Sequence, residues 1–509
     1  MGELEDYLAI ANNFKLGKLD TEGQHPLSID LSRQAVTDLG SAIGVLAQID
    51  INALHMYRKN SGSLIPLAQA ISKTLNNGNK IYLGGCGATG RLSLSIDVLC
   101  REGMLPSEKV GSVIGFMAGG DSALIRSKEG FEDHSEYGAR QLQELGFKNG
   151  DLCIGTTEGG ETSFVIGAVE YAAENSGNNP FILYCNPDSQ LMDIERSRRF
   201  IENKDINNIS LPVGPMSISG STRMQASTVL MDAVGRAIMY RDSPESIPSQ
   251  LDKFIDLVGK FDFSFLKKFI ERESGIYNEG GFVVYKTDRF GIAVLTDTTE
   301  RSPTFSLTPF ENAYFPNDLA CLCYLTMGGA KDVQDAWKLL LHRSPRCVEW
   351  DEYKPNTGID NFYGYDISNS IVGSRKERTG KEQHIFEVMG NGDNIRFQLD
   401  ELSHEVPIKG QPLLYQHLLL KLILNSHSTL VMGRMGRYED NLMTFVAPTN
   451  NKLIDRAIRY VQQLYHRRTG ADVEYETVAS QLFIDRKQLQ PNEPIVLKIL
   501  NNLQGYAPI

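Results

Sequence analysis

The chain has 509 residues, of which 41% are hydrophobic and 22% charged, so it is long enough to form two or more hydrophobic cores. This composition excludes a disordered, collagen-like or coiled-coil protein. Lys and Arg number 51 against 63 Asp and Glu, a formal net charge of −12. Such an acidic balance argues against a broad nucleic-acid surface, because phosphate backbones are bound by clustered cations. Binding of small anions is not excluded.

The cysteines and the N-terminus bear on the type of protein. The seven cysteines lack the paired short spacings of a disulfide framework or a zinc site, so we expect reduced core thiols and no metal. The segment MGELEDYLAI carries acidic residues where a signal peptide carries basic ones. No apolar run reaches the roughly 18 residues of a membrane span. We therefore expect a cytoplasmic protein without membrane contact.

The first part of the chain changes from a helical to an alternating pattern. In DLSRQAVTDLGSAIGVLAQIDINAL, apolar residues recur every three or four positions, which predicts amphipathic helices in an N-terminal arm, residues 1–60. From Lys80, β-rich runs such as KIYLGG and GDLCIGTT alternate with helical stretches. This alternation predicts a doubly wound parallel sheet in a first α/β domain, residues 61–250. In such sheets ligands bind beyond the carboxyl ends of the strands.

The second part of the chain repeats this plan. The segment GGFVVYKTDRFGIAVLTDTTERSPTF again contains an apolar strand, a loop, an arginine and a helix, which indicates an internal duplication. We assign residues 251–410 to a second domain of the same type, with the polar stretch 351–381 as long loops or an insertion. Residues 411–509 include LLLKLILN and KLIDRAIRYVQQLYHRR, which predict a helical lid or cap.

The first candidate loop is GGCGATGR. Gly85, Gly87 and Gly90 fit the G-x-G-x-x-G pattern of dinucleotide sites. However, the acidic residue that would hold a ribose falls about ten positions late, so a dehydrogenase is disfavoured. Thr89 and Arg91 suit a phosphate monoester better, because a hydroxyl, a cation and backbone N–H groups at a helix N-terminus form an anion site. A tight turn without a ligand is the alternative.

Polar side chains also crowd the turn GTTEGGETSF, which contains Thr157, Glu161 and Thr162. One hydroxyl would cap the following helix, but several polar groups beside two glycines favour a hydroxylated ligand. The upstream segment SKEGFEDHSEYG is rich in carboxylates, which usually form a solvated surface. A carboxylate turned into a sugar-phosphate pocket would instead bind sugar hydroxyls or remove a proton from carbon.

A third polar cluster lies in GPMSISGSTRMQAS, where Ser221, Thr222 and Arg223 precede a long helix. The cluster is either a helix N-cap or a cradle for a sugar and its phosphate. A cation placed beside several hydroxyls favours the cradle.

Together these motifs resemble a known family. GGCGATGRLS, AGGDSALIRSKEGFEDHSEYG, GTTEGGETSFVIGA, CNPDS and VGPMSISGSTRMQAS resemble the sugar isomerase (SIS) domain, in the branch of N-acetylmuramic acid 6-phosphate etherases and glucokinase regulatory proteins. The length resembles the regulatory proteins, which are pseudo-dimers of two flavodoxin-like SIS domains with a helical lid. This resemblance implies a sensor of a sugar phosphate such as fructose 6-phosphate, without a cofactor, that regulates a sugar kinase. We take this as the main interpretation.

The resemblance also implies roles for individual residues. Glu132 falls on the carboxylate that acts as base in the etherases and touches the sugar in the regulators. Lys421 matches a lysine that reaches the ligand, although a helix lysine that extends to solvent is the alternative. The expected ligand contacts are Gly87, Thr89, Gly90, Arg91, Thr157, Glu161, Thr162, Ser221, Thr222, Arg223 and Lys421.

The chain departs from the etherase pattern in two places. Leu99 stands where the etherases carry a proton-donating glutamate, which motivates the non-catalytic interpretation. Glu300, in the second domain, lies in a similar stretch and is either a second catalytic group or a family relic. Gly159 replaces the usual serine of the second loop.

Two enzymatic alternatives stay open. The first is an etherase-type carbon–oxygen lyase acting on an amino-sugar 6-phosphate, in which Glu132 removes the proton next to the open-chain aldehyde and lactate leaves. Without a nearby acid this reaction would slow by about 10²–10⁴-fold. The second is a phosphosugar isomerase with Glu132 as its base.

Overall fold

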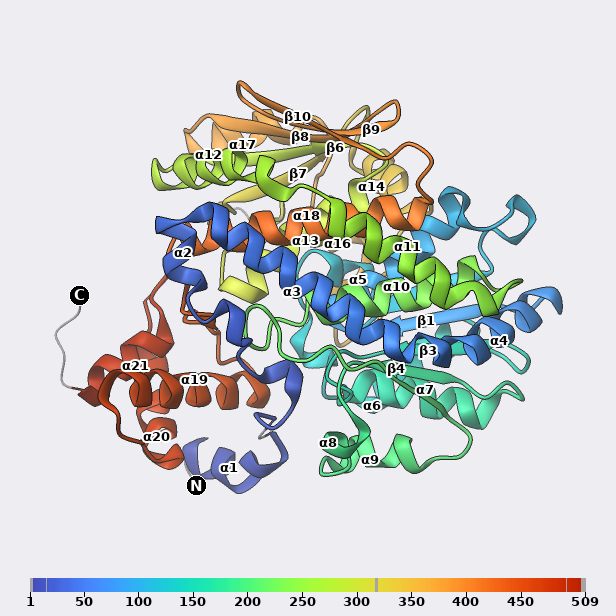
Figure 1. Ribbon diagram of the computed structural model, residues 1–509, viewed down its shortest axis with the longest axis horizontal. Coiled ribbons are helices and arrows are strands. Elements are labelled where there is room, and N and C mark those ends of the chain that lie inside the picture. The colour runs from blue at the N-terminus through green and yellow to red at the C-terminus, as the bar shows by residue number, and fades with distance from the viewer. Residues whose placement is uncertain (1–2, 15, 316–318, 491, 505–509) are drawn as a thin grey trace.

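Two five-stranded sheets lie on either side of a layer of helices (Figure 1). The computed structural model describes residues 3–14, 16–315, 319–490 and 492–504. Strands β1–β5 lie within residues 81–210 and strands β6–β10 within residues 282–407. Each of the two predicted α/β domains therefore contributes one sheet.

The first sheet is parallel, as predicted, with the flavodoxin-like order β2-β1-β3-β4-β5. Helices α4 (Leu64–Asn76), α5 (Gly87–Leu99) and α10 (Gln225–Met239) pack on one face, and α6 (Ser135–Glu144) and α7 (Ser163–Asn175) on the other. Because both faces are covered, every residue of the first three strands is buried. The strands are β1 (Ile81–Gly85), β2 (Val113–Met117), β3 (Leu152–Thr156), β4 (Phe181–Tyr184) and β5 (Asn207–Ser210).

The second sheet repeats only half of this plan. Its order is β10-β9-β8-β6-β7, and the parallel set β7-β6-β8 corresponds to β2-β1-β3. The last two strands are antiparallel, so the predicted fully parallel sheet is wrong there. Two-residue turns at Gly392 (φ 58°) and Asp400 (φ 48°) reverse the chain at once and leave no length for a crossover helix. The strands are β6 (Phe282–Thr287), β7 (Cys323–Met327), β8 (Gln383–Asn391), β9 (Asn394–Leu399) and β10 (Leu402–Pro407).

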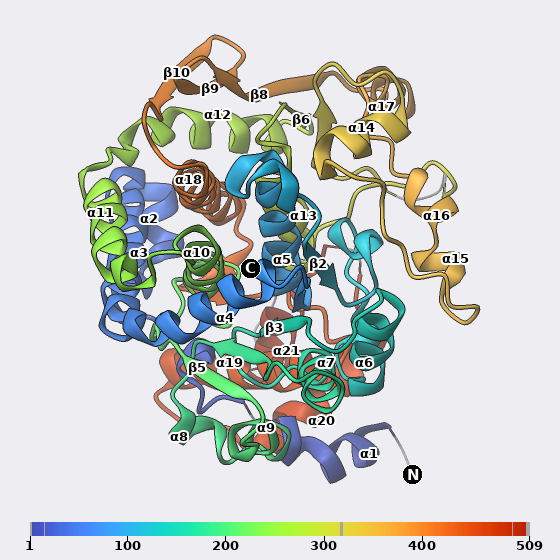
Figure 2. The same cartoon turned by 90° about the vertical axis from the view of Figure 1, so that its right-hand side faces the viewer.

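Helix α18 (Leu413–Arg434) lies at the centre of the molecule (Figure 2). It is buried along almost its whole length and contacts helices from both domains and from the N-terminal arm. These neighbours are α2 (Leu31–Thr37), α3 (Leu39–Asn60), α10, α12 (Leu266–Asn278) and α13 (Gly291–Phe305). A helix surrounded on all sides needs no polar face. Part of the range predicted as a lid is therefore a central packing element, while the domain boundaries themselves stay a prediction.

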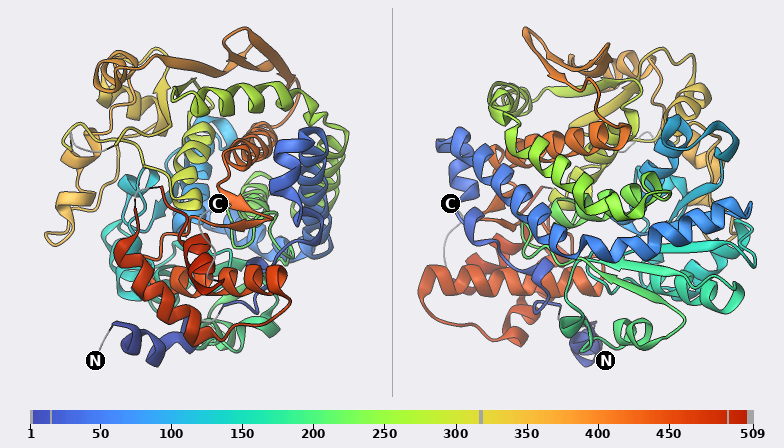
Figure 3. Two further views of the ribbon diagram at one scale, coloured as in Figure 1. Left: turned by 90° about the vertical axis from the view of Figure 1, so that its left-hand side faces the viewer. Right: turned by 45° about the vertical axis from the view of Figure 1, so that its right-hand side comes forward.

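The remaining C-terminal helices pack together near the N-terminus (Figure 3). They are α19 (Asn451–Thr469), α20 (Tyr475–Asp485) and α21 (Ile495–Gln504), and α1 (Glu3–Ile10) packs against α20. The Tyr7 and Tyr475 hydroxyls lie 2.7 Å apart. Glu22 accepts hydrogen bonds from Arg456 (2.6 Å) and Arg459 (2.9 Å) of α19. Buried ion pairs thus join the two ends of the chain.

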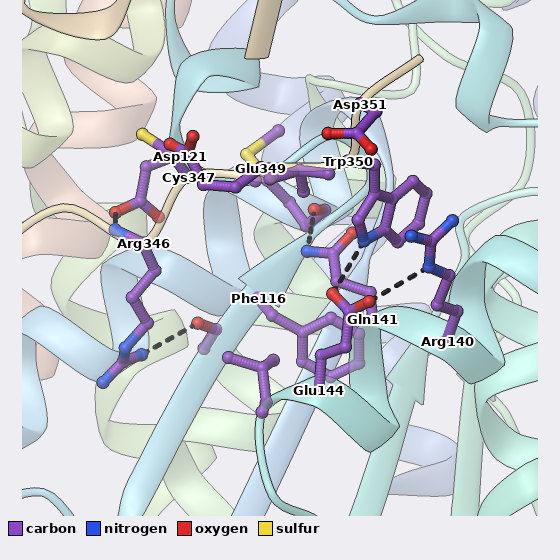
Figure 4. A pocket seen from close by; sticks show the side chains of 15 residues that line it. Phe116, Asp121, Arg140, Gln141, Glu144, Arg346, Cys347, Glu349, Trp350 and Asp351 are labelled. Atoms are coloured by element: carbon purple, nitrogen blue, oxygen red, sulfur yellow. Dashed lines mark hydrogen bonds and ion pairs between the residues drawn. The ribbon is translucent and has the colours of Figure 1, made fainter. Parts of the chain in front are cut away.

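A segment of the second domain covers the free edge of β2. Gly120 and Cys347 form an antiparallel bridge, and Arg343 donates hydrogen bonds to both carboxylate oxygens of Asp121 (2.5 and 3.0 Å). The contact encloses a cavity of about 430 Å³ between β2, α6 and residues 346–351 (Figure 4). Covering an edge strand in this way blocks unwanted strand pairing.

The other elements connect these layers. The stretch predicted as an insertion contains α15 (Lys354–Thr357), α16 (Ile359–Tyr363) and α17 (Ile371–Thr379). The seven cysteines are free thiols. Among the described helices, none has the length and apolar content that crossing a bilayer requires. The remaining α-helices and strands are α8 (Asp188–Leu191), α9 (Glu195–Glu202), α11 (Ile247–Lys260), α14 (Val333–Leu341), β11 (Tyr438–Glu439) and β12 (Leu442–Met443).

Candidate functional site

Seven of the predicted site residues line a cavity of about 510 Å³ between the two domains, here called the interdomain cavity: Gly87, Arg91, Glu132, Ser221, Thr222, Arg223 and Glu300. A smaller polar pocket of about 120 Å³ adjoins it, and the two share Glu132, Thr222 and Lys452. The interdomain cavity is lined, among others, by Gly87, Arg91, Glu132, Ser221, Thr222, Arg223, Glu300, Asn450, Lys452 and Arg456. The polar pocket adds Glu22, Glu158, Glu161 and Thr162. The cavity beside β2 in Figure 4 contains none of the predicted site residues.

The first glycine-rich loop contributes only part of its predicted contacts. Gly87 lines both cavities and has a positive φ of 55°, which a side chain would strain. Gly90 is required for packing, because a Cβ there would lie 2.5 Å from Met117 Cβ. The Thr89 hydroxyl donates to Cys86 O (2.9 Å) and accepts from Cys86 N (3.0 Å). Thr89 therefore caps α5, and of the four contacts predicted in this loop Gly87 and Arg91 line the cavity.

In the second loop, too, one predicted residue stabilises the turn and others line a cavity. Thr157 is fully buried and its hydroxyl lies 3.0 Å from that of Thr162, so it stabilises the turn. Glu161 pairs with Lys452 (2.6 Å) and Arg196 (2.7 Å). Although burial opposes ionisation, these two cations lower the pKa of Glu161 to about 2. A Cβ at Gly159 would lie 3.3 Å from Glu161 Cγ, so a serine there would fit only if the Glu161 side chain moved slightly.

The third loop faces the cavity with all three predicted residues, Ser221, Thr222 and Arg223. Arg223 also donates hydrogen bonds to Asp297 (3.1 Å) of the second domain. Lys421 lies behind this loop, where its Nζ donates to Arg223 O (2.7 Å) and to the Thr228 hydroxyl (2.9 Å). Burial lowers the pKa of Lys421 to about 8. This lysine therefore supports the loop and does not line the cavity.

Two carboxyl groups reach the interdomain cavity from different domains. Glu132 comes from the loop before α6, and its Oε1 lies 3.4 Å from Lys452 Nζ. Glu300 comes from α13 of the second domain and is 3% exposed. Burial raises the pKa of Glu300, and the Arg91 guanidinium opposes that rise only in part. Leu99 is fully buried in α5 and brings no carboxyl group to the cavity, whereas Glu300 reaches the cavity from the opposite domain.

The residues that sequence reasoning missed lie at the start of α19. Asn450 caps this helix by accepting a hydrogen bond from Leu453 N (2.9 Å). Lys452 follows in the first turn, where the helix dipole disfavours a cation. It is placed there by Glu161 and Glu132, and Arg456 lies one turn later on the same wall. A lysine two residues after an asparagine cap was the available signal in the sequence.

Comparisons with known proteins agree with this assignment of the first domain. Residues 63–173 match the family model of the glucokinase regulatory protein N-terminal SIS domain. An N-acetylmuramic acid 6-phosphate etherase 2 of Vibrio cholerae is 32% identical over 217 residues, which are 42% of this chain and 64% of that protein. An etherase of Francisella tularensis is 27% identical over 213 residues, 42% of this chain and 67% of that protein. The chain thus spans slightly less than two thirds of the Vibrio relative.

A solved structure gives a weaker match. The C-terminal domain of glucosamine-fructose-6-phosphate aminotransferase from Francisella tularensis aligns with a TM-score of 0.37 and 10% identity, covering 75% of this chain and 96% of that one. A likeness at this level is too low to support an inference.

The sequence matches confirm the resemblance to the SIS family and correct the main interpretation. The match to the SIS-domain family model spans residues 63–173. The interpretation of the chain as a non-catalytic regulator is wrong, because relatives at 27–34% identity carry the etherase name. The sugar-kinase partner stays an untested prediction, as does a cytoplasmic location. No cluster of three or more His, Cys, Asp or Glu residues suited to a metal ion is found in the described part of the chain.

Proposed function

We propose that the chain is a carbon–oxygen lyase that cleaves the lactyl ether of N-acetylmuramic acid 6-phosphate or a closely related sugar phosphate. One observation carries this proposal: Glu132 and Glu300 line a single cavity in unlike surroundings. Glu132 lies beside the Lys452 ammonium group, whereas burial favours the neutral form of Glu300. Two carboxyl groups whose surroundings differ in this way can serve as base and acid of one reaction.

The sugar phosphate has a suitable binding site in the same cavity. The start of α5 lies at the cavity, since Gly87 lines its wall. Helix N-termini attract phosphate through their free N–H groups and dipole. Ser221, Thr222 and Arg223 add two hydroxyls and a guanidinium. These groups would fix the phosphate, so that the sugar carbons extend toward the two glutamates.

The proposed reaction proceeds by elimination and then addition of water. Glu132 removes the proton from the carbon next to the open-chain aldehyde, and that electron pair forms a carbon–carbon double bond as the ether carbon–oxygen bond breaks. Glu300 donates its proton to the departing lactate oxygen. A water molecule then adds to the former ether carbon and gives a proton to Glu300, while Glu132 returns its proton to carbon. Both glutamates regain their starting forms.

Release of D-lactate from N-acetylmuramic acid 6-phosphate tests the proposal. We expect release by the wild-type chain, complete loss in Glu132→Gln, and a fall in kcat of about 10²–10⁴-fold in Glu300→Gln because acid catalysis is lost. Glu136→Gln is the matched control, because this glutamate lies near Glu132 in sequence but has a side chain 65% exposed. The absence of lactate from the wild-type reaction would refute the proposal, and aldose–ketose interconversion followed by NMR would then test the isomerase alternative.

A further inference from the structure

Glu158 is a carboxyl group of the polar pocket to which the proposed mechanism gives no role. It lies in the turn after β3 and is 8% exposed. The turn is fixed on both sides, because Cys185 N donates to Glu158 O (3.0 Å) and Asn186 donates to Gly159 O (2.9 Å). Its side chain therefore has a defined place in the wall of the pocket.

Unlike the other glutamates of this pocket, Glu158 forms no ion pair with a residue in the described part of the chain. Glu22 pairs with Arg456 and Arg459, and Glu161 pairs with Arg196 and Lys452. Glu132 shares Lys452. By contrast, Glu158 Oε1 is sealed from solvent and receives no hydrogen bond from any described residue. An ionised carboxylate with such an oxygen would carry a large desolvation penalty.

The surroundings instead favour the neutral carboxylic acid. Burial raises the pKa of Glu158 to about 8, and negative charge on the neighbouring Glu132, and on Glu300 when it ionises, acts in the same direction. Lys452 opposes the rise. Glu22 and Glu161 line the same pocket in ion pairs with arginine and lysine side chains. The thiols of Cys86 and Cys185 also lie near Glu158, and burial keeps them protonated by raising their pKa values. A neutral carboxyl group can donate a hydrogen bond, which a carboxylate cannot.

We propose that Glu158 is a specificity-determining residue that donates its carboxyl proton to the carboxylate of the lactyl substituent. This inference rests on the proposed function. The substituent leaves from the carbon that Glu300 would serve, and Glu158 lies within electrostatic reach of both Glu300 and Glu132. The pocket otherwise presents several carboxylates to an anionic substituent, and like charges repel. A carboxylic acid at Glu158 adds no further negative charge and offers a hydrogen-bond donor, and so selects sugar phosphates that carry an acidic ether group.

Binding measurements can isolate this contact. Glu132→Gln serves as the parent, so that bound N-acetylmuramic acid 6-phosphate is not consumed, and N-acetylglucosamine 6-phosphate serves as the same sugar without the lactyl group. Adding Glu158→Ala should raise the Kd of the lactyl sugar about ten- to hundredfold, the usual range for a hydrogen bond to a charged group. The Kd of the sugar without the lactyl group should change less than about threefold, because that ligand never made the contact. Glu174→Gln, on the exposed side of α7, should change neither Kd.

The pH dependence distinguishes a hydrogen-bond donor from a purely structural residue. The pKa of Glu158 is about 8 in the wild type, and the parent lacks the Glu132 charge that contributes to this value. As the pH rises above the lower pKa of Glu158 in the parent, the lactyl sugar should bind about tenfold more weakly per pH unit, because the ionised group cannot donate. Glu158→Gln keeps a neutral donor and should remove this part of the pH dependence, whereas any contribution of Lys421 would be common to both proteins. Equal losses for both ligands, no loss, or an unchanged pH profile in Glu158→Gln would overturn the inference. If neither sugar phosphate binds the parent, the proposed function itself fails.

Discussion

Neutralising Asp297 is the sharpest test of how the two domains hold the site together. Its carboxylate accepts hydrogen bonds from Arg223 (3.1 Å) of the cavity loop and from Arg301 (2.9 Å) on its own helix. All three side chains are at most 3% exposed. Glu273 pairs with Arg301 (2.7 Å), so the buried cluster contains two cations and two anions. Asp297→Asn keeps the shape but leaves one buried positive charge uncompensated.

The distances give the size of the effect. At an effective dielectric constant near 20, each of the two contacts is worth about 5 to 6 kcal/mol of attraction, and desolvation of the charges offsets part of this. Breaking a buried ion pair from one side typically costs about 3–5 kcal/mol. We therefore expect Asp297→Asn to lower the free energy of unfolding by about that amount at pH 7. Such a loss is a large fraction of the usual stability of a protein.

Urea and thermal unfolding, monitored by circular dichroism, measure this change. The effect should shrink at low pH: burial opposes ionisation, but Arg301 and Arg223 hold the pKa of Asp297 below its usual range. A group with a lowered pKa stabilises the fold above its unfolded pKa and loses this contribution as the pH falls through its folded pKa. Asp256→Asn is the control, since that carboxylate is 70% exposed and should change stability by less than about 0.5 kcal/mol. If Asp297→Asn were as mild as this control at pH 7, the reasoning would be refuted.

Three further changes have outcomes that follow from burial and backbone geometry. Burial raises the pKa of Asp50 to about 7, so the free energy of unfolding of the wild type should fall as the pH rises from about 4 to 7. Asp50→Asn should remove this fall. If urea midpoints measured over this pH range changed in parallel for both proteins, this prediction would be contradicted. The pKa of Lys421 is lowered in the folded state, so between about pH 8 and 10 the unfolded chain binds more protons than the folded one, and wild-type stability should rise over this range. Thermal melts of Lys421→Met should show no such rise. Gly87→Ala should cost about 1–2 kcal/mol in urea unfolding, since its φ of 55° is left-handed, and a variant as stable as wild type would show that this backbone relaxes freely.

The first sheet and much of the site were predictable because their signals are local. A strand followed by a glycine-rich turn and a helix marks each loop, and Gly87 and Ser221 follow from that pattern alone. The same logic failed for β9 and β10, whose short hairpin turns resemble ordinary loop sequence within a polar region. The fully parallel second sheet was therefore an extrapolation from β6 and α13.

Contacts between distant segments were not predictable in this way. Lys421 and Lys452 are both helix lysines, and the sequence does not tell which one faces the cavity. The difference depends on where the two helices pack. Helix α18 lies between the domains, so Lys421 donates to backbone carbonyl groups. Helix α19 begins at the cavity, so Lys452 lines it. Likewise, the placement of Glu300 beside the first domain follows from the contact between α5 and α13. Such contacts are fixed by tertiary packing and not by local spacing.

The covering of the cavity by α19 has a consequence for biosynthesis. Lys452 and Arg456 are added to the chain long after Gly87, Glu132 and Glu300. A partly synthesised chain therefore contains these three earlier residues but lacks the wall of the cavity that α19 forms. A ligand that needs this wall would stabilise only the finished molecule, because binding shifts an equilibrium only toward the form that binds. The bound sugar phosphate would therefore stabilise completed molecules and would not affect folding of the chain on the ribosome.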